Sequence, residues 1–385
     1  MRVTRLQLRD FRNYEAAELE LSSELTVVAG PNGAGKTNLL EALYFGCTGR
    51  SPRTSNEREL VRRGAAVARV VVDTHDEEGV HRIEVGFEPG EAKRLRVDDS
   101  PVDSLSAVSA RPLVSVFLPE RLELVKGVPA ARRAHLDQLV AALWPARAET
   151  RAAYSRALAQ RNTLLGRIRA GASGPAALDA WDAELARQGV RLMADRAEAV
   201  EGLRAPFAKL GVRLGLPGPA ELRYRPRSGA TDEQGLASEL GERRAADLER
   251  GFTVHGPHRD ELQLLLEDAP LRAYGSQGQQ RTALLALLFA ERGLLAERRG
   301  RPPLMLLDDV MSELDTERRD LLAGLLRSGG QAVITATEPE HVPGVEEGEL
   351  VRVRDGDLTG ERTASAAAER MPGSAQPEAL AEAPA

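Results

Sequence analysis

Residues 25–45 read LTVVAGPNGAGKTNLLEALYF and place three patterns in a row. An apolar run precedes a glycine-rich turn, and the turn leads into a helical pattern that begins at Lys36. Residues 30–37, GPNGAGKT, fit the phosphate-loop motif G-x-x-x-x-G-K-[ST]. A strand before this motif and a helix after it are the context in which the motif binds phosphate. The stretch therefore predicts a nucleotide-binding α/β protein.

Each residue type in this loop has a physical role. Glycines let the backbone turn its N–H groups toward phosphate, and the helix N-terminus adds a favourable dipole. Lys36 is predicted to reach the β- and γ-phosphates and to act in catalysis, and the Thr37 hydroxyl is predicted to bind Mg²⁺. The predicted ATP-binding residues of the loop are Gly30, Pro31, Asn32, Gly33, Ala34, Gly35, Lys36, Thr37 and Asn38.

A second acidic motif lies far along the chain, at residues 303–315, PLMLLDDVMSELD. Its apolar run ends in Asp308, which is typical of a Walker B strand whose carboxylate holds Mg²⁺. Asp309 is predicted to orient and polarise the attacking water. The alternative for both residues is a charged strand-to-helix junction, since Asp is a good helix cap.

Residues 274–288, YGSQGQQRTALLALL, put a polar, glycine-containing segment in front of a dense apolar helix pattern. Ser276 and the free N–H groups of this helix start are expected to form an anion site without a phosphate of their own. A phosphate from a second subunit could fill that site. The alternative is an ordinary capped helix.

Apolar periodicity divides the rest of the chain. Strands are predicted in residues 2–11, 17–22 and 25–30, followed by an antiparallel side sheet from three short runs between residues 68 and 99, and a buried strand near residue 115. Residues 120–250 are rich in Ala, Leu, Arg and Glu and read as helices of about 20 to 30 residues. Strand signals resume at residue 251, and further strands are predicted in residues 303–309 and 331–335. The predicted domains are a discontinuous head, 1–119 and 251–360, a helical insertion, 120–250, and a disordered tail, 361–385.

Composition excludes several classes of protein. The 385 residues contain a single cysteine, Cys47, so neither a disulfide framework nor a cysteine zinc site can form within the chain. No apolar run is long enough to span a membrane and the N-terminus does not resemble a signal peptide, so we expect a soluble, cytoplasmic protein. The net charge is −6, yet six arginines and one acidic residue lie between Arg147 and Arg169. This stretch is either a nucleic-acid face or an ordinary solvated helix surface.

The order of the motifs resembles the ABC-type ATPase heads of the SMC and DNA-repair class, in which a Ser-Gly-Gly-Gln signature clamps the partner subunit's γ-phosphate. The resemblance extends the predicted ATP site to Ser276, Gln277, Gly278 and Gln279, although Gln277 replaces the first glycine of that signature. It narrows further to the RecF family, on motifs that reach almost to the tail: LRDFRNY, GRSPRT, FLPERLELVKGVPAARRAHLD, GPHRDEL, YGSQGQQRT and LLDDVMSELD.

What the RecF resemblance implies is specific. The expected fold is an α/β ABC-type ATPase head, with a mixed sheet and an antiparallel side sheet, plus an inserted compact helical lobe. Arg12 and Asn13 are expected to contact the nucleotide, although Arg12 could instead be a surface charge. ATP and Mg²⁺ are the implied cofactors. The implied partners are DNA, both duplex and gapped or single-stranded, a second copy of the chain in the presence of ATP, RecR with RecO, and indirectly RecA.

The sequence departs from the ABC pattern at two points. Asp309 stands where ABC enzymes usually have a longer Glu, and residues 334–338, ITATE, offer Thr335 and Thr337 but no His. Both departures predict slow hydrolysis, which suits a switch.

The function that the resemblance favours is an ATP-gated DNA clamp, and two other functions are alternatives to it. A transporter ATPase subunit would need membrane partners, a full signature and a switch His. A small-molecule P-loop kinase would need neither SQGQ nor the SELD that follows Asp309.

Overall fold

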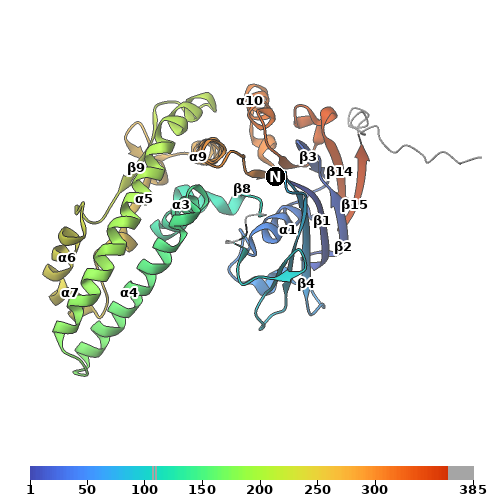
Figure 1. Cartoon of the computed structure of the whole chain (residues 1–385). Helices are drawn as coiled ribbons and strands as arrows, with labels where there is room; N and C mark the ends of the chain where they lie inside the picture. Colours follow the sequence, from blue (N-terminus) through green and yellow to red (C-terminus); the bar gives the residue numbers. More distant parts are fainter. Residues whose placement is uncertain (106–107, 109–110, 363–385) are drawn as a thin grey trace, which may run out of the picture.

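The computed structural model describes residues 1–105, 108 and 111–362 (Figure 1). Two six-stranded sheets form one side of the molecule, and a helical lobe forms the other. The long helix α9 (Gln277–Arg299) lies between them. Within these described residues, no helix combines the length and the apolar character needed to cross a membrane.

The central sheet carries both predicted nucleotide motifs. Its strand order is β15-β14-β3-β13-β12-β8, and all neighbours are parallel except β14 and β15. The bounds are β3 Leu25–Ala29, β8 Val114–Phe117, β12 Leu304–Leu307, β13 Ala332–Ala336, β14 Glu349–Arg354 and β15 Asp357–Arg362. Strands β3, β12 and β13 are buried at every position, because both faces of a mainly parallel sheet are covered.

The second sheet is antiparallel, with the order β2-β1-β4-β5-β6-β7. Its bounds are β1 Arg2–Phe11, β2 Tyr14–Glu20, β4 Ala68–His75, β5 Val80–Phe87, β6 Arg94–Val97 and β7 Ser100–Pro101. Helix α1 (Lys36–Thr48) packs between the two sheets, against β1, β4 and β5 on one side and β8, β12 and β13 on the other. The predicted strands of this region, the antiparallel side sheet and the helix after the phosphate loop are confirmed.

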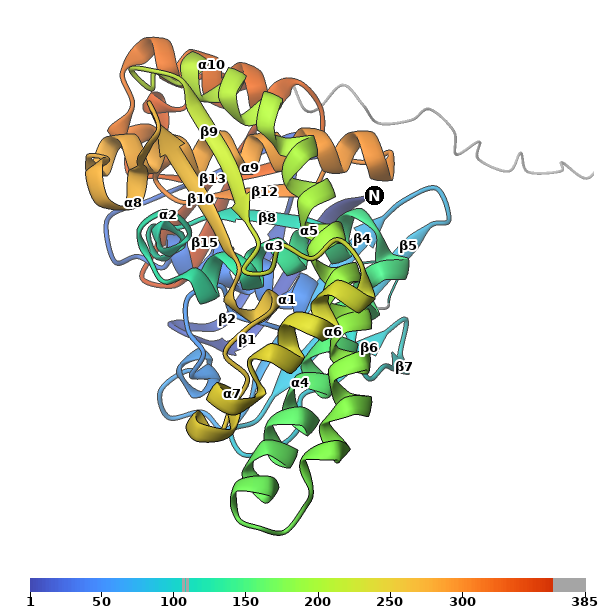
Figure 2. The same ribbon diagram turned by 90° about the vertical axis from the view of Figure 1, so that its left-hand side faces the viewer.

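The helical lobe consists of α3 Pro129–Leu143, α4 Ala148–Arg169, α5 Leu178–Arg213, α6 Glu233–Glu242 and α7 Arg244–Arg250. Helices α4 and α5 form an antiparallel hairpin that is set apart from the sheets in Figure 1 and whose end is the lowest part of the view in Figure 2. A three-stranded sheet of β9 Ala220–Arg225, β10 Glu261–Leu266 and β11 Ala269–Pro270 joins the lobe to the start of α9. Shorter helices are η1 Glu57–Leu60, η3 Pro119–Leu122, α2 Glu123–Lys126, α8 Leu271–Tyr274 and η7 Val310–Glu313, and α10 (Thr316–Arg327) follows η7.

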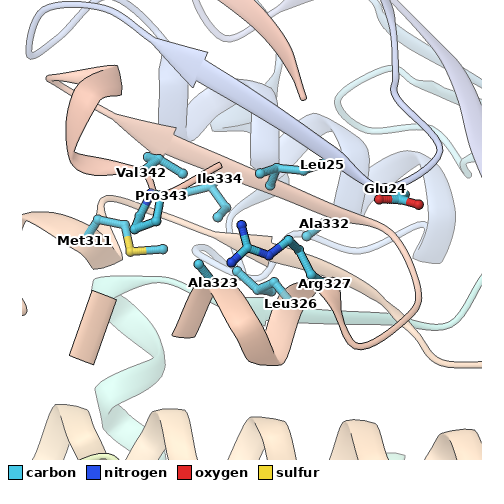
Figure 3. Close-up of a pocket in the computed structure, with 10 residues that line it drawn as sticks. All are labelled: Glu24, Leu25, Met311, Ala323, Leu326, Arg327, Ala332, Ile334, Val342 and Pro343. Carbon is cyan, nitrogen blue, oxygen red and sulfur yellow. The ribbon is translucent and has the colours of Figure 1, made fainter. Parts of the chain in front are cut away.

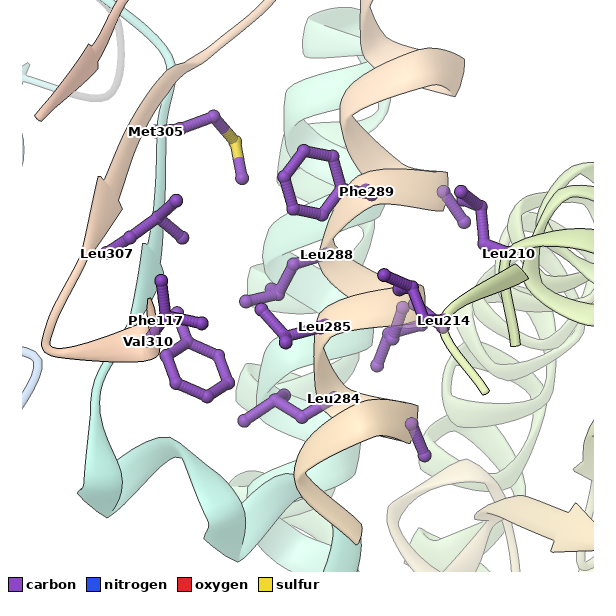
Figure 4. Close-up of a cluster of buried hydrophobic side chains, with 14 of the residues drawn as sticks. Phe117, Leu210, Leu214, Leu284, Leu285, Leu288, Phe289, Met305, Leu307 and Val310 are labelled. Atoms are coloured by element: carbon purple, nitrogen blue, oxygen red, sulfur yellow. The ribbon is translucent and has the colours of Figure 1, made fainter. Parts of the chain in front are cut away.

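The core is continuous across α9. Side chains of one face of α9, including Leu284 and Leu288, pack toward Met305 and Leu307 of β12, and Leu210 and Leu214 of the lobe approach the same helix (Figure 4). Alternate residues of β12 divide between the two sides of the sheet, since Leu304 and Leu306 belong to the core cluster that contains α1. Helix α9 is therefore fixed against the central sheet and the lobe at once.

Several sequence predictions were wrong in detail. Helix α5 has 36 residues and continues through Pro206, so it exceeds the expected 20 to 30. Strand β9 was missed, and it pairs with β10 across the predicted domain boundary at residue 250. The strand expected from residue 251 begins only at Glu261, because the preceding residues form turns and the short helix η6 (Pro257–Arg259).

Two further strands were missed near the C-terminus. Strands β14 and β15 form a hairpin, and β14 pairs with β3. Since β15 ends at Arg362, the predicted tail cannot begin at residue 361. The rest of that tail, residues 363–385, lies outside the described residues.

Candidate nucleotide site

The phosphate loop runs from β3 to α1 at the carboxyl edge of the central sheet. Gly33 and Gly35 have φ values of 82° and 117°, a region that side-chain-bearing residues rarely adopt. A Cβ on Gly30 would come within 2.3 Å of the Val353 carbonyl oxygen, so the close approach of β14 also requires glycine there. Lys36 Nζ donates to the carbonyl oxygens of Gly30 and Pro31, at 2.7 and 3.1 Å, and so lies folded over the loop.

The start of α1 is open to an anion. Its N-cap, Gly35, has no side chain to cap the first N–H groups, and no acidic residue lies in the first turn. The first N–H groups of any helix lack partners within that helix, so those of the residues that follow Gly35 are available to phosphate. Lys36 adds a positive charge at the same place. Burial lowers the pKa of Lys36, and the carboxylates of Asp309 and Asp308 act against that effect.

The two sequence motifs meet at Thr37 and Asp308. The Thr37 hydroxyl lies 2.9 and 3.0 Å from the two Asp308 carboxylate oxygens, although the residues are 271 positions apart. Thr335 Oγ1 donates to the same carboxylate at 2.7 Å. Burial raises the pKa of Asp308, while the bonds from Thr335 and Thr37 oppose the rise. A hydroxyl beside a buried carboxylate is a donor set that suits Mg²⁺, which binds proteins through few oxygen ligands and keeps several waters.

Asp309 follows Asp308 in an unusual backbone conformation. Its φ is 46°, its N–H donates to Thr335 Oγ1 at 2.9 Å, and its carbonyl accepts from Ser312. Its side chain makes no capping bond to the short helix η7, so the helix-cap alternative does not describe it. The cap of the next helix is Asp315, which accepts from the N–H of Arg318.

Residues of the turn between β1 and β2 brace the phosphate loop. Asn13 donates to the Ala34 carbonyl at 3.2 Å and accepts from Asn38 at 2.8 Å. Tyr14 is buried and its hydroxyl donates to the Gly35 carbonyl. Asn32 at the loop accepts a long bond from Thr337, at 3.4 Å.

Arg12, which was expected to contact the nucleotide, donates two nitrogens to Glu41 of α1, each at 2.8 Å. Sequence reasoning missed Tyr14, Glu41 and Arg53, which support the loop and its helix. Their contacts are tertiary, so the sequence signal was limited to their place in three family-like motifs, LRDFRNY, GPNGAGKTNLLEALYF and GRSPRT.

The signature residues lie apart from the phosphate loop. Ser276 caps α9 through a capping box, in which its Oγ accepts from the Gln279 N–H and its own N–H donates to the Gln279 side chain. The structure therefore agrees with the alternative of an ordinary capped helix. The cap uses some of the N–H groups that were expected to be free to bind a phosphate. Ser276, Gly278 and Gln279 line an open pocket of about 360 Å³ together with Arg281 and Arg318. Gln277 is the first residue of the helix. No hydrogen bond joins residues 276–279 to residues 30–38 within the described chain.

A second pocket lies between α10, β3 and β13 (Figure 3). Its volume is about 10 Å³ and its lining is almost entirely apolar, including Leu25, Met311, Leu326 and Ile334. A space of that size holds about one water molecule, so it is a packing gap and not a ligand site.

The motif FLPERLELVKGVPAARRAHLD contains Arg132 and Arg133, which could contact either DNA or acidic residues of the lobe, and both are bonded inside the protein. Arg132 is buried and forms two bonds with Glu261, and Arg133 donates to the Asp260 carbonyl. Both partners follow the predicted lobe of residues 120–250, so these arginines join the lobe to the segment that leads into β10.

The two sheets around α1, the Thr37–Asp308 contact and the capped helix α9 define the class of this protein. It has the fold of an ABC-type ATPase head, as found in SMC proteins. A structure of an SmcHead bound to the C-winged helix domain of ScpA is 16% identical, with a TM-score of 0.59, and the alignment covers 95% of this chain and 99% of that one. The family model described as RecF/RecN/SMC N terminal domain matches residues 2–357.

Closer similarities identify the family: the chain belongs to the RecF family. It is 40% identical to the DNA replication and repair protein RecF of Streptomyces avermitilis, over 93% of this chain and 99% of that protein. It is 39% identical to the protein of the same name from Roseiflexus castenholzii, over 88% and 93%. The solved structure titled recombination mediator protein RecF-ATP in the RecFOR pathway is 29% identical with a TM-score of 0.85, covering 94% and 98%. A second, titled RecF-ATPrS, is 30% identical with a TM-score of 0.82, covering 93% and 97%.

Proposed function

We propose that this chain is an ATP-dependent DNA-binding protein of recombinational repair and DNA replication. The observation that carries the proposal is the contact of Thr37 with Asp308, which joins a phosphate loop to a buried carboxylate in a member of the RecF family. The names of the relatives, DNA replication and repair protein and recombination mediator, give the process.

ATP with Mg²⁺ is the nucleotide that this site fits. In our proposal, residues 30–38 cradle the phosphates, Lys36 binds the β- and γ-phosphates, and Thr37 and Asp308 hold Mg²⁺. Mg²⁺, when bound, supplies positive charge to the phosphate oxygens. Asn13 keeps the loop in place through Ala34 and Asn38. Arg12 takes part through Glu41 and the helix that carries Lys36.

Hydrolysis is proposed to be slow. Asp309 orients the attacking water, and it is shorter than the Glu usual at this position. Residues 334–338 supply the hydroxyls of Thr335 and Thr337 and contain no His. Because hydrolysis is slow, ATP stays bound for longer and the release of DNA is delayed.

We further propose that two copies join through ATP. In that pair the start of α9, with Ser276, Gln277, Gly278 and Gln279, faces the γ-phosphate bound by the partner copy, and the joined heads hold DNA. The open pocket beside Ser276 leaves this surface accessible. Cooperation with RecR and RecO, and through them the delivery of RecA to gapped DNA, is proposed from the family. So is the division into a head and a lobe at residues 119/120 and 250/251.

Lys36→Met tests the proposal. Losing the charge-assisted bonds of Lys36 should weaken ATP binding about 10- to 100-fold or more. Sedimentation of the wild type should show dimers with ATP and duplex DNA, and the variant should remain monomeric. Lys209→Met, at an exposed lobe position, is the matched control and should behave as wild type. Dimer formation by Lys36→Met at the ATP concentration that dimerises the wild type contradicts the proposal.

A further inference from the structure

Four side chains form a continuous chain of ion pairs beside the phosphate-loop helix: Arg12, Glu41, Arg53 and Glu120. Glu41 stands in α1, one turn after Thr37, and its side chain is completely buried. It accepts two bonds from Arg12, one from Ser51 at 2.5 Å and one from Arg53 at 3.2 Å. A buried carboxylate is stable only when it is paired and hydrogen-bonded, and Glu41 meets that need with two arginines.

The two arginines are held very differently. Arg12 directs two nitrogens of its fork at Glu41, with 17% of its side chain exposed. A bidentate pair with a buried partner is costly to break. Arg53 divides its bonds instead, with Nη1 shared between Glu41 and Asn38, and Nε given to Glu120. Glu120 is 40% exposed, so the bond from Arg53 to Glu120 is the weak member of the set.

Arg53 is also close to the reacting end of the site. Its Nη1 donates to Asn38 at 2.9 Å, and Asn38 follows Thr37, which bonds Asp308. Its positive charge reaches Asp308 as well, where it helps to lower a carboxyl pKa that burial raises. Of the two arginines on Glu41, only Arg53 therefore combines a breakable bond with a position beside Thr37 and Asp308.

We propose that Arg53 is an additional nucleotide-responsive residue. Glu41 positions Arg53 beside Asn38, and Glu120 and the terminal phosphate of the bound nucleotide compete for the Arg53 guanidinium. This inference rests on the proposed binding of ATP at residues 30–38. Without nucleotide, Arg53 bonds Glu120. With nucleotide, its guanidinium turns toward the added negative charge and leaves Glu120, while Glu41 keeps its other nitrogen in place.

The released group is well placed to affect the lobe. Glu120 lies in η3, directly after β8, and the next residue, Arg121, bonds His135 of α3 at 2.9 Å. His135 in turn contacts Glu291 of α9 at 2.6 Å. The segment that loses the Arg53 bond is thus the segment that connects the central sheet to α3 and, through His135, to the helix that Ser276 caps.

Affinities of five proteins for Mg-ATP and Mg-ADP, measured by isothermal titration, test the inference: wild type, Glu120→Gln, Arg53→Gln, the double variant, and Glu18→Gln as control. Glu18 forms an exposed ion pair with Arg5 on the antiparallel sheet and takes no part in the ion pairs around Glu41. Removing the competitor in Glu120→Gln should tighten ATP binding about 2- to 5-fold, the range of an exposed ion pair. The gain should be smaller for ADP, which lacks the γ-phosphate.

The double variant separates competition from a general change in charge. If Arg53 mediates the effect, Glu120→Gln should change nothing in the Arg53→Gln background, and Arg53→Gln alone should weaken ATP binding. Unchanged or weaker binding by Glu120→Gln overturns the inference, as does an equal gain in both backgrounds. If the inference about Arg53 fails, the proposed function is still supported when the wild type binds ATP and Lys36→Met does not. Failure of the inference can therefore be distinguished from failure of the proposed function.

Discussion

At the scale of single residues, His258 shows how burial sets a charge state. Its Nε2 lies 3.0 Å from the Thr253 carbonyl and its Nδ1 lies 2.7 Å from the Tyr154 hydroxyl. A carbonyl can only accept, so Nε2 carries the proton and Nδ1 accepts from Tyr154. Both nitrogens are satisfied in the neutral ring. Burial, together with the charges of Arg259 and Arg133, lowers the pKa of His258 to about 4.

This shift predicts that the protein loses stability in mild acid. The unfolded chain binds a proton at His258 near pH 6.5, whereas the folded chain binds it only near pH 4. Between these values protonation favours the unfolded state, so stability should fall as the pH drops, by at most about 3 kcal/mol from this group. Urea unfolding of wild type and His258→Gln at pH 7 and pH 5 checks this, and the variant should show the smaller difference. His81→Gln is the control with the opposite sign, because the hydrogen bond to Asp98 raises the pKa of His81. An identical pH dependence in wild type and His258→Gln contradicts the prediction.

Asp309 gives a second prediction at this scale. Its positive φ is a conformation that Asn also tolerates, so Asp309→Asn should fold normally. Thr37 and Asp308 remain, so ATP binding should persist, while loss of the carboxylate should slow hydrolysis about 10²- to 10⁴-fold. Phosphate release and nucleotide binding, measured on the same preparation, separate the two effects. Turnover at the wild-type rate would remove Asp309 from the catalytic group.

At the scale of elements, helix α9 could be predicted from the sequence, both its existence and its start. The apolar period of residues 283–295 and the polar SQGQ start were both visible, and the helix begins at Gln277, inside the polar segment. Strands β9, β14 and β15 were not visible. Strands β9 and β14 interrupt three apolar residues with arginines and acids, and β15 has one apolar residue. Each of these strands is stabilised by the strand that pairs with it. The same reason hid Glu41 and Arg53, since no local pattern shows that two segments of the chain share one carboxylate.

The capping box makes the start of α9 a test of the composite site. Ser276→Ala removes only the cap and should lower stability by about 1 kcal/mol. Ser276→Arg loses the cap and adds a bulky cation where the partner's γ-phosphate is proposed to bind. Both variants should bind ATP as monomers almost normally, because residues 276–279 make no bond to the phosphate loop in the described chain. Only Ser276→Arg should abolish ATP-driven dimers, hydrolysis and stable DNA holding together. Loss of monomer ATP affinity in Ser276→Arg, or survival of its dimers, would count against the composite site.

At the scale of the whole molecule, a buried network ties the lobe to the segment that precedes α9. Arg196 of α5 bonds Asp137 of α3 at 2.8 and 3.1 Å, Asp260 at 3.0 Å and the Pro257 carbonyl at 2.8 Å. Asp260 also accepts from Tyr224 of β9 and from the Arg227 N–H. Removing one partner from such a buried network lowers the free energy of unfolding by several kcal/mol, about 3–5. We therefore expect α3, α5 and β10 to move as one body.

The same view of the molecule narrows the candidate DNA surface. Of the six arginines between residues 147 and 169, Arg161 is completely buried, and Arg147 and Arg151 pair with acidic residues. Arg156, Arg167 and Arg169 are exposed, and Arg156 and Arg167 lie on the same side of α4. The stretch that looked basic in sequence therefore offers fewer free charges than its composition suggested.

Salt dependence decides whether that exposed side of α4 contacts DNA in a protein whose net charge is −6. Each phosphate contact adds about −0.9 to the slope of log affinity against log salt. We expect ATP-stimulated binding to duplex DNA that depends little on sequence and falls steeply with salt. Replacing Arg156 and Arg167 together by Gln should make the slope shallower by about 2, since two contacts are lost. The control is Arg187→Gln with Arg204→Gln, two exposed arginines of α5 that pair with Glu184 and Glu201, and its slope should stay nearer that of wild type. An unchanged slope in the α4 variant would move the DNA contact from the lobe to the joined heads, because only contacts that release counterions contribute to it.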